Sequence, residues 1–179
     1  NNAGFGTHGP FSEAELTSQL RMMQVNMTAL VHLTRLFLPD MVKRGEGRVL
    51  NVASTAAFAP GPMMAVYYAS KAFVLSFSQA VADEVKGSGV TVTALCPGPT
   101  RTGFQGSAGM EKTRLFSRGV MDANVVAEAG YRAMMRGKPV VVPGLRNSAL
   151  RIASRLVPTS MAIGQVRRLN EDVQGHSGN

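Results

Sequence analysis

Hydrophobic positions recur with helical spacing over the first part of the chain. After Ser12, apolar side chains return every three or four residues as far as Phe37, which is the spacing of one helix face. Ser12 followed by Glu15 forms a capping box, in which Ser12 caps the helix and Glu15 reaches back to it. Pro39 should kink this helix and Gly45 should end it. We therefore predict one long helix between these signals.

Short apolar runs alternate with two further helical segments. The predicted strands are Arg48–Ser54, Val90–Cys96 and Val140–Val142. The predicted helices between them run from about Met64 to Lys86, and from a cap at Asp122 to Gly137. Alternating helices and strands are typical of a parallel sheet with crossover helices, so the fold class is α/β. Residues 147–170 predict one or two short helices, broken at Pro158.

Composition narrows the class of protein. With 179 residues, 45% of them hydrophobic and 17% charged, the chain has the size and composition of one globular domain. No stretch approaches the roughly 18 to 20 apolar residues of a membrane span. A single cysteine, Cys96, excludes an internal disulfide framework and fits a reducing, cytoplasmic setting. Asn1–Pro10 lacks the charged start and apolar run of a secretory signal. Because Asn1 stands first in place of Met, we expect a processed chain or a piece of a longer one.

The net charge of +8 is unevenly distributed. Residues 1–90 carry seven basic and six acidic side chains, whereas residues 91–179 carry twelve and five. The basic residues are dispersed and lack an aromatic stacking platform or zinc-ligand spacing, so we predict no nucleic-acid partner. A basic tail could also lie on a membrane surface. We favour a solvated basic face, with the tail helices packed on their own domain.

Gly4, Gly6 and Gly9 match the G-x-G-x-x-G pattern of dinucleotide-binding loops. That pattern needs a strand before it and a helix opening inside it, so that backbone N–H groups point at pyrophosphate. Almost no chain precedes Gly4, and the helix signals begin later. We therefore interpret this segment as a glycine-rich loop.

A tyrosine and a lysine four residues apart, Tyr67 and Lys71, begin the second helix. Residues at this spacing lie on the same helix face. Lowering the pKa of a tyrosine from about 10 to about 7 needs roughly 4 kcal/mol of preferential stabilisation of the phenolate. An ammonium group one turn away, together with a cationic nicotinamide, can supply it in a partly dry site.

Two polar residues extend this candidate site. Ser54 ends a predicted strand at the carboxyl edge, where open α/β sheets bind ligands. Its hydroxyl could hold a substrate carbonyl oxygen, or could simply cap a loop. Asn26 falls inside an apolar helix, where an amide is unfavourable without a specific partner. A buried amide bonded to the backbone is the alternative explanation for Asn26.

Five motifs in order resemble the short-chain dehydrogenase/reductase family over about residues 1–144. They are Asn1-Asn2-Ala3-Gly4, Val25-Asn26-Met27, Asn51-Val52-Ala53-Ser54, Tyr67-x-x-x-Lys71 and Pro97-Gly98-Pro99-Thr100-Arg101-Thr102. The resemblance implies a doubly wound, Rossmann-type parallel sheet. Residues 1–144 would be the catalytic part of this domain, and residues 145–179 a tail of short helices followed by a disordered end.

The resemblance also implies roles for the matching positions. Tyr67 would be the acid/base, Ser54 would orient the carbonyl or alcohol, Lys71 would bind the nicotinamide ribose and tune Tyr67, and Asn26 would hold a relay water. The positions implied to contact the cofactor, NAD or NADP, are Asn2, Ala3, Gly4, Tyr67, Lys71, Pro97, Gly98, Thr100 and Thr102. No metal is implied. Residues 104–118 match the variable substrate lid of the family.

The chain departs from the family pattern by beginning at the Asn1-Asn2-Ala3-Gly4 motif. The first strands, the glycine-rich phosphate loop and the residue that selects NAD or NADP would precede it. We therefore expect a partial sheet, with residues 1–4 as the end of a strand and the Arg48–Ser54 strand incompletely paired. Such a fragment should be poorly stable alone and should bind cofactor weakly.

The resulting hypothesis is an NAD(P)-dependent oxidoreductase that interconverts a carbonyl and a secondary alcohol of a small molecule. The family commonly pairs its two long helices across a two-fold axis, so we expect a homodimer or homotetramer. A sugar-nucleotide epimerase or dehydratase shares the Tyr67–Lys71 pair, but normally carries a longer region after the last strand. A non-catalytic binding or regulatory protein on this fold is the third hypothesis, and such proteins typically lose the tyrosine or the lysine.

Overall fold

The computed structural model describes residues 1–117, 119–153 and 157–171. Three parallel strands form its main sheet, in the order β1-β2-β5. Strand β1 (Gly47–Val52) pairs with β2 (Val90–Leu95) in a register that joins Gly47 to Val90, and β2 pairs with β5 (Val140–Val141). The prediction of three adjacent parallel strands is confirmed.

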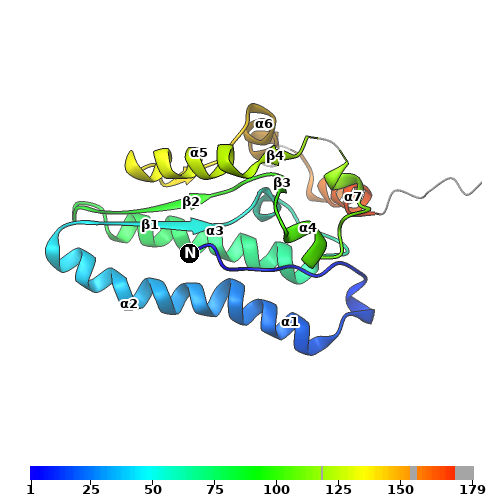
Figure 1. The fold of residues 1–179 in the computed structure, drawn as a ribbon, viewed down its shortest axis with the longest axis horizontal. Helices are drawn as coiled ribbons and strands as arrows, with labels where there is room; N and C mark the ends of the chain where they lie inside the picture. The colour runs from blue at the N-terminus through cyan, green and yellow to red at the C-terminus, as the bar shows by residue number, and fades with distance from the viewer. Residues whose placement is uncertain (118, 154–156, 172–179) are drawn as a thin grey trace, which may run out of the picture.

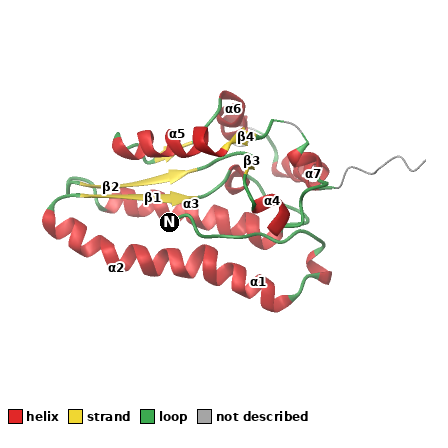
Figure 2. Cartoon of the chain, in the orientation of Figure 1, coloured by secondary structure: helices red, strands yellow, loops and turns green. Residues whose placement is uncertain are grey.

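Helices cover both faces of this sheet (Figures 1 and 2). On one face lie α1 (Leu16–Met23), α2 (Ala29–Arg44) and α3 (Ala65–Glu84), and on the other lies α5 (Ala123–Met135). Gly130 of α5 packs so closely that an added Cβ would lie 2.7 Å from a methyl group of Leu95. This arrangement confirms the predicted partial doubly wound α/β fold.

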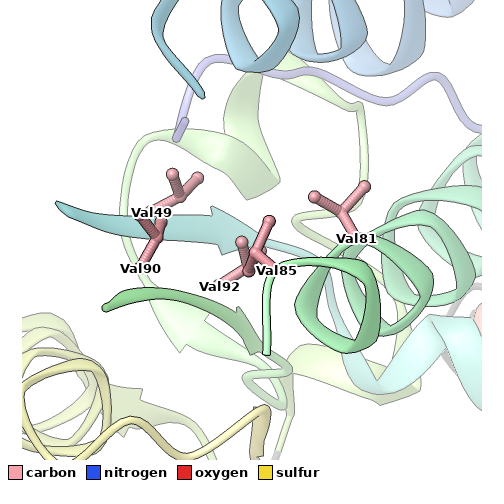
Figure 3. Close-up of a cluster of buried hydrophobic side chains, with 5 residues drawn as sticks. All are labelled: Val49, Val81, Val85, Val90 and Val92. Carbon is pink, nitrogen blue, oxygen red and sulfur yellow. The ribbon is translucent and has the colours of Figure 1, made fainter. Parts of the chain in front are cut away.

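The core between the sheet and the helices consists mainly of valine. Figure 3 shows the cluster formed by Val49, Val81, Val85, Val90 and Val92, which joins β1 and β2 to α3. Leu38 and Met41 of α2 pack against the same cluster. Apolar side chains on two parallel strands, opposed by two helices, are what the alternating sequence pattern predicts.

The first helix begins later than the capping box predicts. Residues Phe11–Glu13 form a single 3₁₀ turn, η1, and α1 begins at Leu16. The Glu15 carboxylate is the actual cap, because its two oxygens accept hydrogen bonds from the amides of Thr17 (2.8 Å) and Ser18 (2.5 Å). The prediction that Ser12 caps this helix is wrong, because a carboxylate placed directly before the first turn satisfies two free N–H groups at once.

A turn of π-helix, η2 (Gln24–Thr28), joins α1 to α2, so the long helix is continuous but not uniform. The amide of Ala29 bonds to the carbonyl of Gln24, five residues earlier. Gly45 ends α2 with a φ of 72°, a left-handed conformation that glycine adopts without strain. The predicted end of the helix is confirmed.

Shorter elements complete the structure. A second, two-stranded parallel sheet joins β3 (Thr100–Arg101) to β4 (Met121–Asp122). Asp122 caps α5 as predicted, accepting a hydrogen bond from the Asn124 amide. The remaining elements are η3 (Thr55–Phe58), α4 (Phe104–Ser107), η4 (Arg114–Phe116), α6 (Leu145–Ala153) and α7 (Thr159–Asn170).

The first residues of the chain form no regular element, whereas the described part of the C-terminal tail is helical. No strand is assigned to residues 1–10, but Asn1 bonds to β1 through its amino group, which donates to Leu50, and its carbonyl, which accepts from Val52. The prediction that residues 1–4 end a strand is therefore wrong as made, although Asn1 keeps strand-like pairing to β1. The predicted tail helices are present, with Pro158 preceding α7, whereas the predicted disordered end falls on residues 172–179, outside the described residues. Among the described residues, no helix is long and apolar enough to cross a membrane.

Candidate active site

The helix α3 carries Tyr67 and Lys71 on one face. The Lys71 Nζ atom lies 5.8 Å from the centre of the Tyr67 ring, as the four-residue spacing predicts. Lys71 is 6% exposed and donates a 2.9 Å hydrogen bond to the carbonyl oxygen of Val52, at the end of β1. Lys71 therefore connects α3 to the carboxyl edge of the main sheet.

Ser54 follows β1 at the same edge and faces Tyr67. Its hydroxyl oxygen accepts a 3.1 Å hydrogen bond from the amide of Ala56, which makes it the cap of η3. The Ser54 hydroxyl also lies close enough to the Tyr67 hydroxyl to act on the pKa of Tyr67, which it lowers. The loop cap expected as one interpretation of Ser54 is therefore present, and the role toward a substrate stays a prediction, because a hydroxyl that accepts from the backbone retains its own hydrogen to donate.

Asn26 lies in the π-helical turn and is 2% exposed. Its side-chain oxygen accepts from the amide of Phe5 at 3.1 Å, and its side-chain nitrogen donates to the Phe5 carbonyl at 2.9 Å and to Ser70 Oγ at 3.1 Å. Ser70 in turn donates to the carbonyl oxygen of Tyr67 at 2.7 Å. A buried amide bonded to backbone, the alternative explanation from the sequence, therefore describes the contacts of Asn26.

The Asn2-Ala3-Gly4 segment runs along this group of residues. Its three residues are exposed, and a Cβ added to Gly4 would lie 3.0 Å from Asn26 Oδ1 and 3.5 Å from Lys71 Nζ. Gly4 is thus the point where the N-terminal segment approaches Asn26 and Lys71. Gly6, in the rejected G-x-G-x-x-G pattern, packs against Tyr67 and Phe104, and residues 4–9 form neither a strand nor a helix.

The segment after β2 lies beside the loop that follows β1. Pro97 accepts a 2.8 Å hydrogen bond from the amide of Thr55, which holds the two strand-end loops together. Gly98 packs against Asn147, where an added Cβ would lie 2.6 Å from the side-chain amide. Thr100 and Thr102 bond within their own loop: the Thr100 hydroxyl donates to the Gly98 carbonyl, and the Thr102 hydroxyl accepts from the Phe104 amide.

Burial controls the protonation of this site. Burial raises the pKa of Tyr67 to about 12, and the hydrogen bond from Ser54 acts in the opposite direction. Burial lowers the pKa of Lys71 to about 8. Bringing Tyr67 from that value to about 7 therefore needs about 7 kcal/mol, and the protein groups of the described site do not supply it by themselves.

Three residues near the site were missed by the sequence analysis. Ser70 connects Asn26 to the Tyr67 backbone, Tyr68 lies beside Tyr67 with ring centres 6.1 Å apart, and Asn170 bonds to Tyr68 from the far end of the chain. Ser70 and Tyr68 stand inside the quoted Tyr67–Lys71 motif, so position alone could have indicated them. Asn170 carries no local signal.

A parallel α/β sheet with a half-buried tyrosine and serine and a buried lysine near its carboxyl edge is typical of dehydrogenases of the Rossmann type. The family model for short-chain dehydrogenases matches residues 1–113. The chain therefore belongs to the short-chain dehydrogenase family.

Similar proteins carry dehydrogenase and reductase names. The chain is 32% identical over 173 residues to the ketoacyl reductase HetN of Nostoc sp. strain PCC 7120, covering 96% of this chain and 58% of that protein. It is 29% identical over 153 residues to D-beta-hydroxybutyrate dehydrogenase of Rhizobium meliloti, covering 86% of this chain and 58% of that protein. The chain thus spans little more than half the length of these curated relatives.

Solved structures match nearly the whole chain. A short-chain dehydrogenase from Sphingobium yanoikuyae in complex with NADPH superimposes with a TM-score of 0.75 at 30% identity, covering 99% of this chain and 66% of that one. A bulky-bulky ketone specific alcohol dehydrogenase from Comamonas testosteroni gives a TM-score of 0.69 at 28% identity, covering 99% and 64%. The Rossmann-type architecture is thereby established.

Proposed function

We propose that the protein containing this chain is an NAD(P)-dependent oxidoreductase that interconverts a carbonyl and a secondary alcohol. The observation that carries the proposal is the convergence of Ser54, Tyr67 and Lys71 at the carboxyl edge of the sheet. The NADPH complex of the Sphingobium relative supports a nicotinamide cofactor, and a Brucella melitensis reductase with 25% identity, solved with NADH, leaves the choice between the two forms open.

The residues at Lys71 fit the ribose end of such a cofactor. Among the described residues, Lys71 donates its one hydrogen bond to Val52, and an ammonium group has three donors. The absence of a side chain at Gly4 leaves space beside Lys71 Nζ. Two free donors beside an exposed backbone segment suit a pair of ribose hydroxyls. Asn2, Ala3, Pro97, Gly98, Thr100 and Thr102 are proposed as further cofactor contacts.

In the proposed mechanism, Tyr67 moves the proton. When an alcohol is oxidised, the Tyr67 phenolate accepts the hydroxyl proton while the carbon gives up a hydride; carbonyl reduction is the reverse. Ser54 donates a hydrogen bond to the reacting oxygen and holds it beside Tyr67. Lys71 stabilises the phenolate, and Asn26 holds the helix turn behind it. A nicotinamide held there would supply the hydride chemistry and, in its oxidised form, would add the positive charge that favours the Tyr67 phenolate.

The substrate proposed for this site carries an apolar group next to its carbonyl. The side chains that pack with Tyr67 form one apolar cluster; its members include Met64, Phe104, Met110, Leu115 and Phe116. Residues of the proposed lid segment thus bring apolar surface to Tyr67. A hydrocarbon substituent would bury surface there, whereas a charged substituent would lose its hydration.

An assembly of two or four copies is also proposed. An open groove of about 410 Å³ lies between α2 and α3, lined by Met27, Val31, His32, Arg35 and Phe73, among others. Apolar and basic residues side by side along two exposed helices support pairing of this face with a second copy.

The test compares Tyr67→Phe with Tyr131→Phe in the complete gene product. Tyr131 is an exposed tyrosine on α5 and controls for loss of a hydroxyl. We expect Tyr67→Phe to lose at least a hundredfold in turnover, within the range of general acid–base catalysis, and to keep its cofactor affinity. Lys71→Ala should weaken both. Wild-type turnover in Tyr67→Phe would refute the mechanism; cofactor binding without any turnover in wild type would favour the non-catalytic hypothesis.

A further inference from the structure

The last residue of α7 is buried against the start of α3. Asn170 is 0% exposed. Its side-chain nitrogen donates a 2.9 Å hydrogen bond to the carbonyl oxygen of Pro62, and its side-chain oxygen accepts from the Tyr68 hydroxyl at 3.3 Å. Both ends of this amide are therefore satisfied by the segment that leads into Tyr67, although more than 100 residues separate Asn170 from it.

The backbone of the same residues makes two further contacts. His8 Nε2 lies 2.7 Å from the carbonyl oxygen of Asn170, which can only accept, so the imidazole donates. The carbonyl of Glu171 accepts a hydrogen bond from the amide of Arg114, in the proposed lid. Asn170 and Glu171 thus connect the C-terminal end of α7 to four other segments. These are the N-terminal loop, the loop before α3, α3 itself and the proposed lid (Figure 1).

The start of α3 depends on such contacts because it has no side-chain cap of its own. Met64 precedes the helix and makes no capping hydrogen bond. The loop before it lies flat on the Tyr68 ring: a Cβ added to Gly61 would fall 2.1 Å from that ring. Asn170 bonds to Pro62 on one side of this contact and to Tyr68 on the other, which fixes the first turn of the helix.

Tyr67 takes its position from this turn. Its ring contacts Tyr68 edge to face and lies 5.2 Å from the ring of Phe104. Val166 of α7, one turn before Asn170, packs against the same apolar cluster. Movement of α7 would therefore change both the orientation of Tyr67 and the wall beside it.

We propose that Asn170 is a positioning residue for Tyr67, acting through its hydrogen bonds to Tyr68 and Pro62. This inference rests on the proposed function of Tyr67. We assign Asn170 no role in binding the cofactor, because its hydrogen bonds go to Pro62, Tyr68 and His8, and not to Lys71 or Asn26. The helix α7 lies outside residues 1–144, the predicted catalytic part. It nevertheless affects the rate of proton transfer, because it sets the position of Tyr67.

The experiment uses four variants of the complete gene product: Asn170→Ala, Asn170→Asp, Tyr68→Phe and, as a control, Asn124→Ala on the exposed face of α5. Turnover number, Michaelis constants, cofactor dissociation constant and thermal unfolding are measured for each. We expect Asn170→Ala to lose up to about a hundredfold in kcat, as displaced catalytic groups do. Tyr68→Phe, which keeps the Pro62 bond, should lose about fivefold. Cofactor affinity should stay within about twofold of wild type, because those contacts are unchanged.

Asn170→Asp provides the readout that a merely structural role would not give. A neutral carboxyl group keeps one acceptor and one O–H donor, and burial raises its pKa, so this variant should keep activity at low pH and lose it when the carboxyl ionises. The plot of kcat against pH for Asn170→Asp should therefore show a fall at the pH where this carboxyl ionises. Wild type and Asn170→Ala should lack that fall, when all variants are measured at a temperature where they are folded.

The outcomes separate this inference from the proposed function. Wild-type kcat in Asn170→Ala and Tyr68→Phe, with Tyr67→Phe inactive, would overturn the inference and leave the function standing. Equal losses of kcat and cofactor affinity in Asn170→Ala would also overturn it, because they indicate general loosening. Turnover retained in Tyr67→Phe would overturn the proposed function, and this inference with it.

Discussion

Replacing Lys71 with methionine should change how the stability of the protein depends on pH. Lys71 is 6% exposed, and burial lowers its pKa from 10.5 to about 8. In the unfolded chain the lysine regains its ordinary value. Between these two values the unfolded state binds a proton that the folded state has released, so stability rises with pH. The contribution is complete above pH 10.5 and is lost as the pH falls through about 8.

The size of this effect follows from the two pKa values. Between pH 7 and pH 10 the free energy of unfolding should gain roughly 2–3 kcal/mol from Lys71 alone. Methionine has a similar volume and no charge, so Lys71→Met removes this gain. The variant also loses the hydrogen bond to Val52, but that loss shifts its stability by the same amount at every pH.

The assay is urea unfolding of the complete gene product, without cofactor, at intervals from pH 7 to pH 10. The quantity of interest is the difference between wild type and Lys71→Met, which cancels other titrating groups. Lys86→Met provides the matched control, because Lys86 is an exposed lysine paired with Asp83. If the free energies of unfolding of wild type and Lys71→Met change equally between pH 7 and pH 10, within about 0.5 kcal/mol, Lys71 is not a buried, titrating lysine.

Three further predictions follow from the site and the surface. Gly98→Ala should lower the free energy of unfolding by about 1–3 kcal/mol, because its Cβ would meet the Asn147 amide, whereas Gly103→Ala, with open space around it, should have little effect; denaturant titration compares them. Arg101→Ala should raise the Michaelis constant for cofactor or substrate, since this exposed cation follows the Pro97–Thr100 turn, and unchanged constants for both would remove it from the site. Light scattering of the complete gene product should give the mass of two or four copies, and a one-chain mass at micromolar concentration would contradict the assembly.

The elements predicted best are those whose signals lie within a few residues. Helix α3 was expected from about Met64 to Lys86 and spans Ala65–Glu84, because a steady helical period ends in a glycine-rich turn. Gly45 ended its helix as expected, since only a left-handed residue closes that turn readily. The strands β1 and β2 were likewise placed within two residues of their ends.

The parts that could not be predicted depend on partners distant in the chain. The helix cap is an exception, because both candidates are local: Glu15 replaces Ser12 as the cap since its two oxygens reach the amides of Thr17 and Ser18. The π-helical turn forms where Asn26 meets Phe5 and Ser70, and no helical pattern encodes those partners. The two-residue strands β3 and β4 are too short to show a period. For the site, the motifs identified Ser54, Tyr67 and Lys71, but the contacts of Asn170 emerge only when the chain is folded.

The π-helical turn also fixes the rotational phase of the long helix. A π-turn holds one more residue than an α-turn, so it behaves as a one-residue insertion. Upstream of it, α1 buries Gln19 and Met22; downstream, α2 buries Leu30 and Thr34. Deleting one residue within Gln24–Thr28 would restore regular α-helix but turn the upstream face by about 100°. The buried side of α1 would then turn away from the core, so the exposed positions Gln24 and Thr28 should tolerate substitution far better than the segment tolerates a change in its length.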